Sequence, residues 1–127
     1  MPEIVSNTGP LIALASINQF DLLKKLFGKV FIPPAVRAEI LDETTVSAVN
    51  KAKWLIIHSV QDRIAVQILG EELDPGESEA IILAREMNAD LLLIDERAAR
   101  RKAATLELST IGTLGVLLMA KKQGFVP

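Results

Sequence analysis

The sequence lacks cysteine and contains a single histidine, His58. The absence of cysteine excludes disulfide scaffolds, zinc knuckles and thiolate nucleophiles, and one histidine leaves no imidazole pair for a zinc site. No apolar run approaches the ~18 residues of a membrane span, and Met1-Pro2-Glu3 lacks the basic, then apolar, pattern of a signal peptide. We therefore expect a cytoplasmic protein with no membrane partner. If it is an enzyme, carboxylates must carry its chemistry.

The chain also has no large excess of charge of one sign. Its 14 lysines and arginines nearly balance its 16 aspartates and glutamates, leaving a net charge of −2. That balance argues against a general DNA coater, whose affinity rests on surplus positive charge, but it allows a local basic patch. The 127 residues are fewer than the ~150 of a typical domain, and half of them are apolar. We expect one globular domain, residues 1–127.

Segments typical of strands alternate along the chain with segments typical of helices. The run Leu91-Leu92-Leu93-Ile94 is continuously apolar, as in a strand buried on both faces, and Asp74 and Glu77 have the spacing of a capping box. The predicted strands are 4–5, 30–32, 54–60, 91–94 and 108–111, and the predicted helices are 11–17, 18–27, 34–41, 45–52, 62–73, 75–87, 96–105 and 113–123. This alternation predicts the α/β class, as a three-layer α/β/α protein with a central parallel sheet of four or five short strands.

Polar side chains stand near one predicted edge of this sheet. Asn7 follows the first strand and Asp95 follows the apolar run, while Glu39 and Glu79 lie on helices that begin near the same edge. Ligands of open parallel sheets bind beyond the carboxyl ends of the strands, so these side chains are candidates to converge there. Converging carboxylates repel one another unless a cation offsets their charge, and such oxygen ligands suit Mg²⁺ or Mn²⁺. Each residue also has a structural interpretation, as a turn residue, helix cap or solvated helix face.

Five blocks of the chain, in order, carry a resemblance to a known family. The first block is 4–15, with Asn7-Thr8-Gly9-Pro10-Leu11 at its centre, and the others are 31–40, 73–81, 92–100 and 111–118. Together they resemble PIN-domain proteins, in which an Asp-Thr-Ser-Pro-Leu-like run follows the first strand, and the last block is similar to the prokaryotic subgroup akin to VapC-type toxins. Any one block is ordinary, but five in order are specific, and they cover the chain from Ile4 to about Phe125.

The resemblance implies an endoribonuclease that depends on Mg²⁺ or Mn²⁺, often the toxin of a toxin–antitoxin pair and often a homodimer. RNA and an antitoxin protein are then the expected partners. Glu39, Glu79 and Asp95 fall where the family places acidic metal ligands, and Thr8 falls beside the first acid, where a hydroxyl can support a metal-bound water. Glu77 is an alternative to Glu79, which we prefer as the ligand because Glu77 already has a role as a helix cap.

Asn7 departs from the family pattern, which has its first aspartate at this position. An amide oxygen can ligate a hard cation but adds no formal charge, and removing one preorganised electrostatic group can lower a rate by roughly 10²–10³. Asn7 is consistent with a native protein of low activity and with an engineered change in a toxic one. It also favours an alternative function, a catalytically impaired module that binds RNA or an antitoxin partner.

Arg97, Arg100 and Arg101 follow Asp95 closely on one predicted helix. Such a run is usually a solvated face paired with neighbouring glutamates. Beside an acidic cleft, however, it can hold RNA phosphates, which arginine binds in bidentate fashion.

A phosphoacceptor receiver domain is a rival interpretation, because it has a similar length and α/β alternation. Those domains require an acidic pair after the first strand, where this chain has Asn7 alone. The rival interpretation is therefore weak, and the nuclease hypothesis is preferred.

Overall fold

The computed structural model describes residues 2–127, which form five strands and eight helices. The strands are β1 (Ile4–Ser6), β2 (Val30–Ile32), β3 (Leu55–Ile57), β4 (Leu91–Leu93) and β5 (Thr110–Ile111). The helices are α1 (Thr8–Ser16), α2 (Leu22–Phe27), α3 (Pro34–Glu39), α4 (Glu43–Lys51), α5 (Arg63–Leu69), α6 (Pro75–Glu86), α7 (Arg97–Thr105) and α8 (Thr113–Lys122). Each predicted strand and helix has a counterpart in this order.

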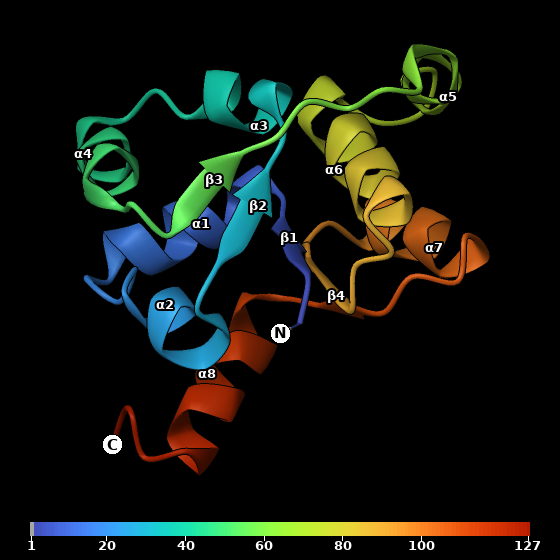
Figure 1. Ribbon diagram of the computed structural model, residues 1–127. Coiled ribbons are helices and arrows are strands. Elements are labelled where there is room, and N and C mark those ends of the chain that lie inside the picture. Colours follow the sequence, from blue (N-terminus) through green and yellow to red (C-terminus); the bar gives the residue numbers. More distant parts are fainter. Residues whose placement is uncertain (1) are drawn as a thin grey trace.

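The five strands form one parallel sheet in the order β3-β2-β1-β4-β5. Helix α6 packs on β1 and β4 and against α5, while α2 packs on β2 and against α8, and α1 packs against α4 and α8. Figure 1 shows these helices arranged around the sheet. The predicted three-layer α/β/α fold with a parallel sheet is confirmed.

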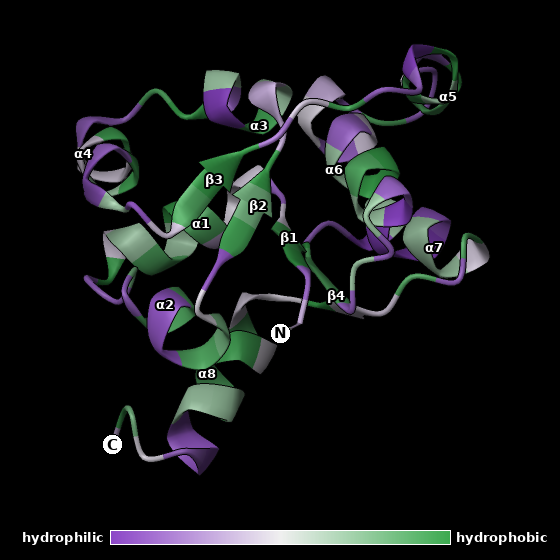
Figure 2. Cartoon of the chain, viewed as in Figure 1, coloured by the Kyte–Doolittle hydropathy of each residue, from purple (hydrophilic) through white to green (hydrophobic). Residues whose placement is uncertain are grey.

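The core lies between the sheet and its helices. Val5, Leu92 and Leu93 are buried because the sheet is covered on both sides, and α6 buries Gly76 and residues 78–84. Figure 2 shows the strands mainly in the green of hydrophobic residues, whereas the helices around them carry both hydrophobic and hydrophilic residues. None of the helices within residues 2–127 is long and apolar enough to cross a membrane.

The chain turns sharply between α1 and α2. The backbone of Asn18 is in the left-handed region, with φ of 58°, and the N–H groups of Asn18 and Gln19 donate back to the carbonyl oxygens of Ala15 and Leu14. These bonds form a Schellman motif, which ends a helix. Helix α2 therefore begins at Leu22 rather than at Asn18, where the sequence pattern predicts its start.

Candidate functional site

The sheet has its topological switch point between β1 and β4. From β1 the chain leaves toward β2 and β3 and then returns to β4 on the other side, and ligands of such sheets bind in the crevice at this point. The backbone N–H of Asn7, directly after β1, donates to the carbonyl oxygen of Leu93 at the end of β4 over 2.8 Å. Asp95 follows two residues later, so Asn7 and Asp95 lie beyond the ends of adjacent strands.

An acidic cavity of about 400 Å³ opens at this crevice. Its lining residues come from the end of β1, the start of α1, the end of α3, the start of α6 and the segment after β4. Five carboxylates and no basic side chain line it. The lining residues are Asn7, Thr8, Gly9, Ile12, Glu39, Asp74, Glu77, Asp95 and Glu96.

The Glu39 carboxylate is held in place by neutral donors. The Thr8 hydroxyl donates to its Oε1 over 2.7 Å, and the Gly76 N–H donates to its Oε2 over 2.8 Å. A side chain at position 76 would overlap this carboxylate. Thr8 therefore supports an acidic side chain, and glycine at the start of α6 gives that side chain room.

Asp95 is held in a similar way by the first residue of α8. The Thr113 N–H donates to its Oδ1 over 2.6 Å and the Thr113 hydroxyl donates to its Oδ2 over 2.7 Å. A Cβ at Gly112 would lie 2.7 Å from Asp95 Oδ1, so a side chain here would displace the Asp95 carboxylate. Sequence reasoning missed Thr113, although its place after the last predicted strand put it at the same edge of the sheet.

Glu77 combines its predicted cap with a place in the cavity. Its N–H donates to Asp74 Oδ1 over 2.7 Å and its Oε1 accepts from the Asp74 N–H over 3.1 Å, which completes the capping box. Burial raises the pKa of the Glu77 carboxyl, and the charges of Asp74, Glu96 and Glu39 add to that rise, against the lowering effect of the Asp74 backbone hydrogen bond. The cavity is thus unfavourable to further negative charge.

Glu79 lies away from this cavity, in contrast to the expectation that it joins the other candidates. Two residues along a helix turn through about 200°, so positions 77 and 79 face nearly opposite directions. The buried Glu79 carboxylate accepts from the Ala35 N–H over 3.0 Å and pairs with Arg63 Nη1 at 2.7 Å. It satisfies a backbone donor in the first turn of α3 and joins α3, α5 and α6.

The side chains that line the cavity offer oxygen donors, which are the ligands that a hard divalent cation prefers. Asn7 is only 6% exposed, and its Oδ1 has no hydrogen-bond partner within residues 2–127. A buried acceptor without a partner is costly, and the surrounding carboxylates repel one another unless a cation is present. In the described residues, no three His, Asp or Glu side chains are close enough together to hold a metal ion, so the candidate ligands line one cavity without forming a coordination sphere.

The predicted basic cluster lies beside the cavity. Arg97, Arg100 and Arg101 are exposed on α7. A Cβ at Gly112 would lie 3.3 Å from Arg100 Nη1 as well as close to Asp95, so this guanidinium is near the cavity rim. Among residues 2–127, none of the three arginines forms an ion pair.

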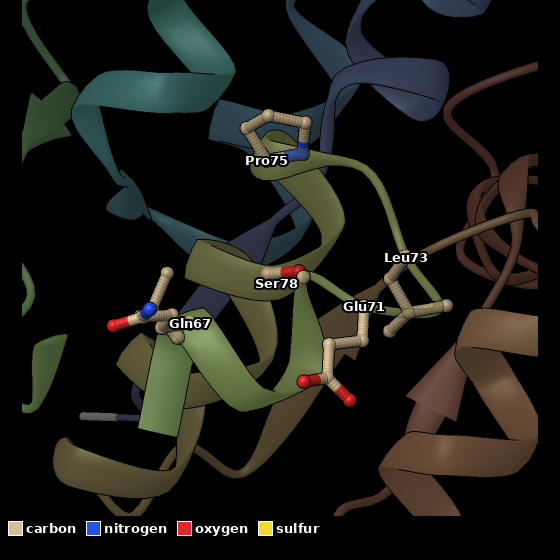
Figure 3. Close-up of a pocket in the computed structure, with 7 residues that line it drawn as sticks. Gln67, Glu71, Leu73, Pro75 and Ser78 are labelled. Atoms are coloured by element: carbon tan, nitrogen blue, oxygen red, sulfur yellow. The ribbon is translucent and has the colours of Figure 1, made fainter. Parts of the chain in front are cut away.

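A different cavity, of about 340 Å³, lies between α5 and α6 (Figure 3). Pro75 and Ser78 come from α6, and Gln67, Glu71 and Leu73 come from α5 and the segment after it. The buried Ser78 Oγ has no hydrogen-bond partner in the described part of the chain. This mostly apolar cavity has one carboxylate, Glu71, and lacks the convergent acidic side chains of the switch-point crevice.

The fold and the crevice together define a class: a parallel α/β/α protein with an acidic cavity at its switch point. A family model described as a PIN domain matches residues 3–127, and the chain belongs to this family, whose domain is a nuclease fold. The predicted family is confirmed. PIN domains generally depend on a divalent metal and bind nucleic acid.

The fold resembles a solved structure of a PilT N-terminus domain protein from the hyperthermophilic archaeon Sulfolobus solfataricus P2. The two chains are 19% identical, with a TM-score of 0.62 over 92% of each chain. At this identity the similarity establishes a shared fold. No curated protein matches the sequence.

Proposed function

We propose that the protein is a metal-dependent endoribonuclease of the PIN type. The observation that carries this proposal is the acidic cavity at the switch point, where Asn7, Glu39, Glu77 and Asp95 come from four separate parts of the chain. Five carboxylates line this cavity with no basic side chain to balance them, an arrangement that favours a bound cation.

The proposed ligands are Asn7, Glu39, Glu77 and Asp95, and the cation is Mg²⁺ or Mn²⁺ because all their donors are hard oxygens. Glu77 replaces Glu79 in this set because Glu77 lines the cavity, whereas Glu79 pairs with Arg63. When bound, such a cation supplies an activated water and neutralises charge during phosphodiester hydrolysis.

The chain's own residues position these groups. Thr8 and the Gly76 N–H orient Glu39, and Thr113 orients Asp95 through both carboxylate oxygens. Such outer contacts limit the rotation of the carboxylates and keep their oxygens directed at one place. Thr8 is therefore a positioning residue, acting through Glu39.

Arg97, Arg100 and Arg101 are the proposed contacts for RNA phosphates. They are exposed on the helix that begins next to Asp95 and Glu96, and Arg100 is close to the cavity rim. Guanidinium groups bind phosphate oxygens in pairs, so they would draw the RNA backbone toward a cavity that otherwise repels it.

We also propose that the protein is the toxin of a toxin–antitoxin pair and forms a homodimer. The block 111–118, similar to VapC-type toxins, supports the toxin role. The same block places Leu114 and Leu118 on α8, where they are 71% and 56% exposed. Adjacent exposed leucines favour association, and in a two-fold dimer this face would cover itself. Copurification with the product of a neighbouring short reading frame tests the antitoxin role.

The decisive experiment measures Mn²⁺ binding by calorimetry and cleavage of single-stranded RNA with and without EDTA. We expect Mn²⁺ to bind, and cleavage to require the metal and to be lost in Asp95→Asn. Glu43→Gln, an exposed change on α4 outside the cavity, is the control and should leave both unchanged. If Asn7→Asp, which restores the family's first acid, neither binds Mn²⁺ nor cuts RNA, the nuclease proposal is wrong.

A second candidate function is a module that binds RNA or an antitoxin without cutting. Asn7 favours it, because the amide contributes no charge to the cation site. RNA binding without cleavage in the native protein, together with cleavage by Asn7→Asp, would assign the native chain to this function.

A further inference from the structure

A basic cavity of about 700 Å³ lies away from the acidic one. It is formed by the turn between α1 and α2, by α2, by the end of α4 and by the segment that leads into β3. In Figure 1 these elements lie on the left of the molecule, with α2 below α4. The charged side chains that line it are Asp21, Lys24, Lys25, Lys51 and Lys53, and the aromatic ones are Phe20 and Trp54.

This cavity concentrates positive charge in a chain whose net charge is −2. It holds four of the eight lysines in the sequence and only one carboxylate, Asp21. All four lysines are exposed, and none forms an ion pair with a carboxylate within residues 2–127. The cavity therefore carries an uncompensated excess of positive charge.

Helix stability explains only part of this clustering. Lys24 and Lys25 lie in the last turn of α2 and Lys51 in the last turn of α4, where cations interact favourably with the helix dipole. Lys53 lies outside any helix, and the dipole gives no reason for two helices to direct their basic ends at one cavity. The convergence points to an anionic ligand.

The chemistry of the lining selects the class of anion. Lysine ammonium groups are compact point charges that bind phosphates without fixing their orientation, and no arginine lines the cavity. The Trp54 ring packs on the buried Phe20 ring with a centroid separation of 5.4 Å and remains partly exposed. Single-stranded nucleic acids bind to this combination of basic groups and aromatic rings, through phosphate contacts and base stacking.

We propose that this lysine cavity, comprising Lys24, Lys25, Lys51, Lys53 and Trp54, is a second binding site for the single-stranded RNA substrate. The inference rests on the proposed ribonuclease function. Helix α1 connects the two sites, because Thr8 at its start lines the acidic cavity and Asn18 beyond its end lines the lysine cavity. Nine residues of helix span roughly 14 Å. The lysine cavity would thus bind the RNA at a distance from the carboxylates of the acidic cavity, which repel phosphates.

Trp54 gives a direct test, because it is the single tryptophan in the chain. Homopolymeric single-stranded RNA is titrated into the 127-residue protein in EDTA, and the tryptophan fluorescence is recorded at several salt concentrations. We expect saturable quenching that weakens as salt rises. In the variant Lys24→Gln, Lys51→Gln, Lys53→Gln, the slope of log affinity against log salt should fall by about 2, since each lost single-strand phosphate contact contributes about 0.7.

The control is Lys29→Gln, Lys121→Gln, Lys122→Gln, which removes the same charge outside this cavity and should leave the slope nearly unchanged. Equal losses in the two triple variants, or no quenching by RNA, would overturn the proposal. Quenching by polyglutamate but not by RNA would also overturn it, and would assign the cavity to an acidic protein partner. Experiments on Asn7→Asp separate the two proposals. If RNA quenches Trp54 in the native chain while Asn7→Asp neither binds Mn²⁺ nor cuts RNA, the metal-dependent nuclease is refuted and an RNA-binding site remains.

Discussion

Asn7, directly after β1, is the position at which the sequence resemblance leads us to expect an aspartate. Its Oδ1 is buried and unpartnered among residues 2–127, and it lines a cavity with five carboxylates. We expect Asn7→Asp to bind Mn²⁺ more tightly and to raise RNA cleavage by up to about 10²-fold, as for a restored preorganised group. Calorimetry and a cleavage time course measure both. Asn88→Asp adds the same charge far from the cavity, and an equal gain there would contradict a local role for Asn7.

Glu77 gives the acidic cavity a characteristic pH dependence. Because its pKa is raised in the folded state, chiefly by burial, the folded protein binds more protons than the unfolded chain between the two pKa values. The free energy of unfolding therefore falls as the pH rises through that window. Glutamine at position 77 can keep the capping box without the charge.

We accordingly expect Glu77→Gln to raise the thermal midpoint at pH 7 in EDTA, with the gain disappearing below the ordinary glutamate pKa of 4.5. Thermal unfolding followed by circular dichroism across this pH range measures the effect. Glu43→Gln should show no comparable gain, and a Glu77→Gln gain that persists in acid would refute the electrostatic explanation.

The sequence did not allow a correct choice between Glu77 and Glu79 as the residue that lines the acidic cavity. Both residues follow the capping residue Asp74. The sequence indicated a capping role for Glu77 but no structural role for Glu79, so Glu79 was predicted to be the metal ligand. The partners of Glu79, the Ala35 N–H and Arg63, are distant in sequence and depend on how α3 and α5 pack on α6. In contrast, Asn7 and Asp95 could be placed because each directly follows an apolar strand.

The start of α6 is a packing contact as well as a helix terminus. Gly76 is the second residue of α6, and its missing side chain is what admits the Glu39 carboxylate from α3. Alanine favours a helix interior over glycine by about 1 kcal/mol. This gain partly offsets the cost of displacing the Glu39 carboxylate, so Gly76→Ala should change the thermal midpoint only slightly. Displacement of Glu39 should weaken Mn²⁺ binding by about 10- to 100-fold, as for other losses of support behind a metal ligand.

Calorimetry with Mn²⁺ and thermal unfolding on the same samples separate these two effects. Gly70→Ala, a matched change at the end of α5, should leave Mn²⁺ binding unaltered. Full Mn²⁺ affinity in Gly76→Ala would show that the contact between α3 and α6 does not position Glu39.

Element boundaries were predicted where a local signal exists. The capping box at Asp74 and the glycine stops at Gly28 and Gly124, with φ of 79° and 80°, were all readable from sequence. The late start of α2 was missed because it depends on the left-handed backbone of Asn18, a residue that also tolerates helical conformations. The predicted strand 54–60 shortens to Leu55–Ile57, since only this part pairs with β2.

At the scale of the whole molecule, the alternation of apolar strands and helices was enough to predict a parallel α/β/α fold. The handedness of the crossovers leaves few ways to arrange such units. The convergence of the acidic side chains could not be derived from spacing alone, because it depends on strand order. Strands β1 and β4 are neighbours in the sheet, although β2 and β3 come between them along the chain. The family resemblance supplied that information.

The exposed leucines of α8 make a prediction at the same scale. If Leu114 and Leu118 form the core of a dimer, replacing both with alanine removes four leucines from the interface. The dissociation constant should rise by roughly 10⁴-fold, since each buried leucine contributes at least about 1.5 kcal/mol. Analytical ultracentrifugation over a concentration series measures it. Ile64→Ala, Ile68→Ala is the matched control on α5, where both side chains are exposed; a larger loss in that variant would move the interface to α5.

The position of Thr113 links the proposed α8 dimer to the acidic cavity. It is the first residue of α8, it holds both oxygens of Asp95, and it is followed directly by Leu114. Dimerisation through α8 would restrain Thr113, the residue that hydrogen-bonds to Asp95. Turnover per subunit would then rise with protein concentration.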